Sequence, residues 1–120
     1  MRPMVYFPAT PLFPFRRTWS LETIWKAAEN LPIEEVEVDV LWGDYANIWC
    51  WRHEEEDLTH DYFLSHMKRV LEADLEYPIM LSEEGLVFDG IHRLTKAKLL
   101  GIQTIKVKRF KADPCCYSYF

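Results

Sequence analysis

The sequence predicts a small α+β domain with three helices around a mixed sheet. Segments with the apolar spacing of helices alternate with segments that have the two-residue alternation of strands, and 120 residues fit one compact domain. Apolar residues make up 49% of the chain, which is enough for a hydrophobic core. No repeat or low-complexity tract divides the chain. We therefore expect a single domain over residues 1–120, with an extended Pro- and aromatic-rich arm over about residues 1–17.

Three helices are predicted from capping residues and apolar spacing. Ser20 is the expected N-cap of the first helix, which Pro32 ends and whose apolar residues are Leu21, Ile24, Trp25, Ala28 and Leu31. Thr59 is the expected N-cap of the second helix, whose apolar face is Phe63, Met67, Val70 and Leu71. The third helix follows Asp89-Gly90, covers residues 91–100 and stops at Gly101.

The strands are predicted from alternation and turn residues. Val36, Val38 and Val40 alternate with acidic residues, which predicts a half-buried strand. Residues 42–51 are rich in aromatics and predict a loop followed by a short strand. The sequence Ser82-Glu83-Glu84-Gly85 predicts a turn between strands at 79–81 and 86–88. A last strand is expected over 104–110.

Cysteine usage and hydropathy favour a cytoplasmic protein that does not span a membrane. Cys50, Cys115 and Cys116 are odd in number and two are adjacent, so they form a poor disulfide framework and we expect reduced thiols. No apolar run approaches the ~20 residues that span a bilayer. Prolines interrupt the apolar residues of the N-terminal arm, which is unlike a secretory signal.

Charge is distributed unevenly along the chain. The net charge is -5, yet half of the fourteen basic residues lie between residues 90 and 112, where there is no acidic residue. These basic residues are Arg93, Lys96, Lys98, Lys106, Lys108, Arg109 and Lys111. An acidic body disfavours sequence-independent DNA binding, for which a basic domain is usual. A local anion site is compatible with the pattern.

The segment Asp89-Gly90-Ile91-His92-Arg93 predicts such an anion site. The first N–H groups of a helix have no partner within the helix, and the helix dipole favours negative charge there. Gly90 allows a ligand to approach the backbone. His92, Arg93 and, one turn later, Lys96 can add hydrogen bonds to phosphate oxygens. The alternative is that Asp89 caps the helix and that His92 and Arg93 pair with carboxylates elsewhere.

The same motif and its surroundings resemble the ParB/sulfiredoxin superfamily, most closely its small stand-alone ParB-like proteins with an Asp-Gly-X-His-Arg core. The matching positions are Tyr77-Pro78-Ile79-Met80-Leu81, Gly85, Val87, Asp89 to Arg93, Ala97, Gly101 and Val107. The resemblance covers the last third of the chain best. It implies the ParB/sulfiredoxin fold and a nucleotide-phosphate site formed by Gly90, Ile91, His92, Arg93 and Lys96.

Ile91 separates this chain from the best-known chemistries of that superfamily. Sulfiredoxins have their catalytic cysteine at this position, and partition ParB proteins have the acid that serves CTP and its metal. Free-serine kinases of the superfamily carry Asp-Gly-His-His-Arg, which differs from this chain only at Ile91. The resemblance therefore implies a phosphotransferase or NTPase that uses ATP, ADP or CTP, with Mg²⁺, on a small molecule. Asp89 and His92 are the expected catalytic residues.

Alternatives remain open at this point. A general base for a hydroxyl acceptor would come from Glu34, Glu35 or Asp39. A second hypothesis is a non-catalytic module that uses the same pocket, or the aromatic N-terminal arm, to bind a protein or a nucleotide. A third is a ParB-like nuclease or DNA-binding protein, and a homodimer is compatible with each hypothesis. The aromatic residues Trp42, Tyr45, Trp49 and Trp51 are better explained as core than as a base-stacking surface. No metal site is predicted, because the Cys50 and His53 pair has no second pair at a matching interval.

Overall fold

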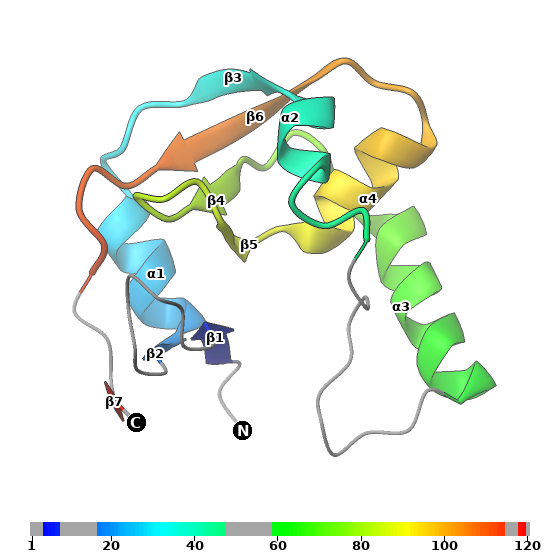
Figure 1. The fold of residues 1–120 in the computed structure, drawn as a ribbon, viewed down its shortest axis with the longest axis horizontal. Helices are drawn as coiled ribbons and strands as arrows, with labels where there is room; N and C mark the ends of the chain where they lie inside the picture. Colours follow the sequence, from blue (N-terminus) through cyan, green and yellow to red (C-terminus); the bar gives the residue numbers. More distant parts are fainter. Residues whose placement is uncertain (1–3, 8–16, 48–58, 115–117, 120) are drawn as a thin grey trace.

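A four-stranded mixed sheet, in the order β3-β6-β4-β5, organises the domain (Figure 1). The computed structural model describes residues 4–7, 17–47, 59–114 and 118–119. The strands are β3 (Glu34–Glu37), β6 (Thr104–Arg109), β4 (Ile79–Leu81) and β5 (Val87–Asp89). β6 runs parallel to β4 and antiparallel to β3, and β4 and β5 form the predicted hairpin. A smaller antiparallel sheet consists of β1 (Met4–Phe7), β2 (Arg17–Ser20) and β7 (Ser118–Tyr119).

Alternation along the strands gives the large sheet two covered faces. Ile79 and Leu81 point into one core cluster, whereas Met80 between them packs against the other. The first cluster joins the sheet to α2 (Val38–Trp42) and α4 (Ile91–Leu99). The second cluster joins it to α1 (Leu21–Ala28) and to Trp19 of β2. The site motif at the β5–α4 junction therefore sits between two packed layers.

Four helices are present in the described residues, one more than the sequence predicts. The caps of two predicted helices are confirmed, because Ser20 accepts a hydrogen bond from the Thr23 amide and Thr59 accepts one from the Tyr62 amide. The additional helix is α2. The predicted strand over Val36 to Val40 is wrong beyond Glu37, where the chain turns into this helix. Val38 and Leu41, three residues apart, are both buried, whereas Val40 is 67% exposed, so the helical spacing decides which side chains reach the core.

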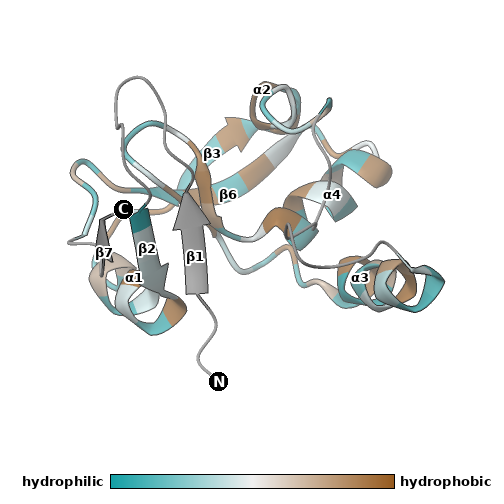
Figure 2. Cartoon of the chain, turned by 60° about the horizontal axis from the view of Figure 1, so that its bottom comes forward, coloured by the Kyte–Doolittle hydropathy of each residue, from teal (hydrophilic) through white to brown (hydrophobic). Residues whose placement is uncertain are grey.

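The second predicted helix, α3 (His60–Glu72), begins after the expected N-cap but does not bury the whole of the expected face. Its buried residues are His66 and Val70, and it packs beside α4 at the opposite end of the molecule from α1 (Figures 1 and 2). Phe63 and Leu71, which the sequence places on the core face, are 46% and 62% exposed. The apolar stripe of α3 is thus wider than the surface that α4 covers.

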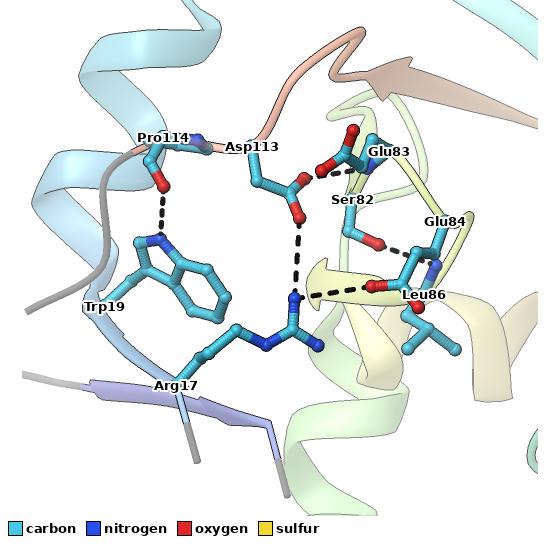
Figure 3. A network of polar contacts seen from close by, with 8 residues as sticks. All are labelled: Arg17, Trp19, Ser82, Glu83, Glu84, Leu86, Asp113 and Pro114. Atoms are coloured by element: carbon cyan, nitrogen blue, oxygen red, sulfur yellow. Dashed lines mark hydrogen bonds and ion pairs between the residues drawn. The ribbon is translucent and has the colours of Figure 1, made fainter. Parts of the chain in front are cut away.

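A polar network connects the small sheet to the hairpin and to the chain after β6 (Figure 3). The buried guanidinium of Arg17 lies 3.3 Å from Oε1 of Glu84 and 3.9 Å from Oδ2 of Asp113. Oδ1 of Asp113 accepts a hydrogen bond from the Glu83 amide, and the Trp19 indole donates to the Pro114 carbonyl. Burial raises the pKa of Asp113, while the hydrogen bond from the Glu83 amide and the charge of Arg17 act to lower it. Arg17 therefore favours the ionised form of this carboxyl group and partly offsets the effect of burial.

We predict that Arg17→Met raises the pKa of Asp113 further, because the positive charge that favours the carboxylate is removed while the burial remains. A carboxyl pKa that is raised in the folded state disfavours folding above the unfolded pKa, and this cost disappears when the group is protonated. The variant should therefore lose more stability at pH 7 than at about pH 3. Carboxyl NMR titration and urea unfolding at both pH values measure these effects.

Lys111→Met is the matched control for that substitution, because it removes an exposed positive charge close to Asp113 in the sequence. It should leave the Asp113 pKa near its original value. An Asp113 pKa that is unchanged or lower in Arg17→Met would contradict the role given to Arg17.

Candidate functional site

The junction between β5 and α4 depends on Gly90. This residue is the N-cap of α4 and has a φ angle of +114°, a conformation that L side chains rarely adopt. A Cβ at this position would stand 2.9 Å from Cγ1 of Ile79 and 3.2 Å from Nη1 of Arg93. Both the backbone conformation and the space therefore require glycine. Because glycine has no side chain, residue 90 cannot cap the first amides of α4 in the way that Ser20 and Thr59 cap α1 and α3.

A pocket of about 290 Å³ lies beside this junction. Its lining comes from α1, from the segment before β4, from β4 and from the β5–α4 junction: Trp25, Tyr77, Pro78, Met80, Asp89 and Arg93. Trp25 and Tyr77 are 46% and 61% exposed, although both are large aromatic side chains. The pocket thus combines partly exposed aromatic and apolar walls with one carboxylate and one guanidinium.

Asp89 and Arg93 are held in place by their neighbours on the pocket wall. The Trp25 indole N–H donates a 2.8 Å hydrogen bond to Oδ2 of Asp89. Nη1 of Arg93 lies 3.9 Å from the same oxygen and donates to the Pro78 carbonyl at 3.3 Å. The Arg93 guanidinium also lies over the Tyr77 ring, 5.8 Å from its centroid. These contacts hold the guanidinium beside Gly90, at the N-terminal end of α4.

His92 points toward α3 rather than into the pocket. Its Nε2 lies 2.9 Å from Nδ1 of His66, and the two rings stack with centroids 5.2 Å apart. The edge of the Tyr62 ring packs against His66. Burial, followed by the nearby His66 and Arg69, lowers the pKa of His92 to about 4. At neutral pH His92 is therefore uncharged and connects α4 to α3.

The two other predicted binding residues also lie outside the pocket lining. Ile91 packs against the core cluster on the α2 and α4 face of the sheet. The Lys96 ammonium group donates to the carbonyls of Leu71 and Ala73, at 2.9 Å and 2.7 Å, and so satisfies acceptors at the C-terminal end of α3. Of the predicted site residues, the structure brings Asp89, Gly90 and Arg93 together at the pocket.

The acidic residues considered as general bases lie far from Asp89. Glu34 and Glu35 belong to β3 and are exposed, and β6 and β4 separate this strand from β5. Asp39 of α2 forms an ion pair with Lys98, with its Oδ1 2.8 Å from the ammonium nitrogen. Asp89 is therefore the carboxylate that the described residues contribute to the pocket wall.

The sequence did not indicate four residues that shape this region: Trp25, Tyr77, Met80 and His66. Trp25 was expected in the core because it follows the helical apolar spacing, but the α1 stripe contains Ile24 and Trp25 side by side and only Ile24 is buried. Tyr77 matched the family resemblance without an assigned role. His66 reaches His92 from 26 residues away in the sequence, so only tertiary packing reveals the pair.

The remaining sequence hypotheses have separate outcomes. Trp42 and Tyr45 pack against the core, and the Tyr45 hydroxyl accepts a hydrogen bond from the Val87 amide. Trp49, Trp51, the three cysteines and the acidic residues 54–57 lie outside the described residues. Within the described part of the chain, no three His, Cys, Asp or Glu side chains are grouped as metal ligands. Over the same residues, no helix combines the length and apolarity needed to cross a bilayer.

Comparisons of the chain with protein-family models, with curated proteins and with solved structures found no match.

We predict that His92 makes stability depend on pH. Its pKa is lower in the folded chain, about 4, than the ordinary value of 6.5, so the unfolded chain binds the proton more readily. The stabilisation is present above about pH 6.5 and is lost as the pH falls toward 4. His92→Gln should therefore show a smaller loss of melting temperature than the wild type between pH 7 and about pH 4.5.

His60→Gln is the control, because it removes an exposed histidine from α3 and should retain the wild-type pH dependence. The prediction would be contradicted if the melting temperatures of His92→Gln and the wild type fell equally with pH. It would also be contradicted if NMR showed the His92 imidazole to titrate near pH 6.5 in the folded chain.

Proposed function

We propose that this chain is a nucleotide-binding domain whose pocket lies at the β5–α4 junction. The observation that carries the proposal is the pocket that joins two partly exposed aromatic rings, Trp25 and Tyr77, to the Arg93 guanidinium beside the uncapped N-terminus of α4. Aromatic walls suit a nucleobase, and a guanidinium next to the N-terminal end of a helix suits a phosphate. The two chemistries of a nucleotide thus meet in one place.

The phosphate would bind at the start of α4. The helix dipole and the amides of the first turn favour an anion, and Gly90 keeps side-chain atoms away from the backbone. The contacts of Arg93 Nη1 with Asp89 and Pro78 are long, at 3.9 Å and 3.3 Å, so a phosphate at the helix end would compete with them for this group. Because His92 is neutral at pH 7, the positive charge at this site comes from Arg93.

The base would stack on the aromatic wall. The pocket volume of about 290 Å³ lies at the lower end of the range for ligand sites, about 300–1,000 Å³. This volume suits the base and part of the sugar, while a di- or triphosphate would extend along the open end of α4. Asp89 would then face the sugar or a phosphate-bound Mg²⁺, which proteins commonly hold through one or two carboxylates together with the phosphates.

The resemblance of the Asp89 to Arg93 segment to the ParB/sulfiredoxin superfamily supports the same assignment. We extend the proposal to that fold: the β4–β5 hairpin, α4 and the parallel neighbour β6 follow one another in the order that the resemblance implies. The resemblance implies a phosphate site at the same Gly90 and Arg93 that lie at the pocket.

Binding without turnover is the better supported form of this function. Transfer of a phosphoryl group to a hydroxyl requires a base near the acceptor, and Glu34, Glu35 and Asp39 are not at the pocket. A phosphotransferase or NTPase is the second candidate, because Asp89 lies on the pocket wall and would serve as the base or as the Mg²⁺ ligand. His92 would then act indirectly, by fixing α4 against α3.

Calorimetric titration with ATP, ADP, CTP and GTP, each with and without Mg²⁺, tests the proposal. We predict that at least one nucleotide binds and that Arg93→Ala weakens it roughly 10- to 100-fold, as expected when charge-assisted hydrogen bonds worth about 1.5–3 kcal/mol are lost. Tyr77→Ala should weaken the binding of nucleotides more than the binding of inorganic phosphate, because it removes the stacking surface for the base and leaves the charge of Arg93 in place. Phosphate release in the same samples separates an NTPase from a binding module.

Arg109→Ala is the matched control, because it removes an exposed arginine of β6 that does not line the pocket. Its affinity should equal that of the wild type. No binding by any of the four nucleotides at millimolar concentration, or full affinity in Arg93→Ala, would contradict the proposal.

A further inference from the structure

The outer face of α3 exposes a row of apolar side chains. Phe63, Leu64 and Leu71 are 46%, 66% and 62% exposed, and Met67 lies among them. Phe63, Met67 and Leu71 recur every four residues, which places them along one side of the helix. α3 buries His66 and Val70 and packs beside α4, and in two views it lies at the end of the molecule away from α1 (Figures 1 and 2). Its apolar face is therefore open to a partner.

The charges along this row are arranged in opposite halves of the helix. Asp61 lies in the first turn, and Lys68 lies seven residues later, so both border the same side of Leu64 and Leu71. Both are exposed, and neither forms an ion pair with another residue that the structure describes. The N-terminal half of α3 thus carries the negative charge of Asp61, and the C-terminal half carries a net positive charge because Lys68 and Arg69 outnumber Glu72.

This arrangement is complementary to itself when two copies meet in opposite directions. A two-fold axis that crosses α3 near Leu64 and Ser65 places Asp61 of each copy beside Lys68 of the partner subunit. A parallel arrangement would instead place Asp61 beside Asp61 and Lys68 beside Lys68, which is repulsive.

We propose that the α3 face defined by Phe63, Leu64, Met67 and Leu71 binds a second copy of this chain in an antiparallel, two-fold symmetric pair. The dimer does not depend on nucleotide binding. The 13 residues of α3 extend over about 20 Å, so the contact is smaller than the ~1,200 Å² at the lower limit of stable interfaces. The dimer is therefore weak and forms only at high protein concentration.

Sedimentation equilibrium of the full chain over a range of about 5–500 µM tests this interface. The average mass of the wild type should approach that of a dimer at the highest concentrations of this range. Leu64→Glu should raise the dissociation constant at least about 10-fold, because it places a charge in the apolar row. Circular dichroism and thermal unfolding confirm that each variant is folded, which we expect because Asp61, Leu64 and Lys68 are all exposed.

Charge reversal identifies the partner as a second copy. Asp61→Lys alone and Lys68→Asp alone should each be monomeric, because like charges then meet twice across the axis. An equimolar mixture of the two variants should recover the dimer, since both contacts then join opposite charges. Asp44→Lys and Lys111→Asp change the net charge equally at exposed positions outside α3 and should dimerise like the wild type.

The other outcomes overturn the proposal. A wild type that remains monomeric at about 500 µM would leave the α3 face to a partner of another kind. A dimer that persists in Leu64→Glu, or a mixture of the charge variants that remains monomeric, would show that the copies do not associate through this face in an antiparallel arrangement.

Discussion

The close approach of Gly90 to Ile79 is the constraint on which the rest of the site depends. At a φ angle of +114°, the chain turns from β5 directly into α4, with no room for a Cβ between this junction and Ile79 of β4. The hairpin and the helix can therefore pack on the same core while the first turn of α4 stays open at its end. The side chains on either side of Gly90 then diverge.

This divergence separates a binding side from a supporting side. Asp89 and Arg93 face the pocket with Trp25 and Tyr77, whereas His92 meets His66 on α3. Lys96, one turn further along α4, satisfies carbonyl groups at the end of α3. Four charged or titratable residues were predicted to bind or act on a ligand: Asp89, His92, Arg93 and Lys96. Two of them, His92 and Lys96, instead hold α4 against α3. The charge available to an anion is concentrated in Arg93, and the apolar face of α3 remains open on the outside.

Local signals in the sequence were sufficient for the hairpin, α4, β6 and two helix caps, because turn residues, alternation and capping act over a few neighbours. They failed at Val38, where alternating valines fit a strand and a short helix equally well, and for the small sheet that joins β2 to β1 and β7. Asp89, Gly90 and Arg93 could be predicted from their motif. Trp25 and His66 could not, because their partners lie 64 and 26 residues away and meet them only after folding.

The central claim is that an anion binds at the open end of α4, and amide NMR shifts report on it directly. Titration of the ¹⁵N-labelled chain with ADP should shift the amides of Gly90, Ile91, His92 and Arg93 most, together with the indole signal of Trp25, whose N–H already faces Asp89. The exposed apolar face of α3 should be unaffected. Shifts confined to the β3 edge or spread along the lysines of β6, with the α4 amides unchanged, would contradict the account.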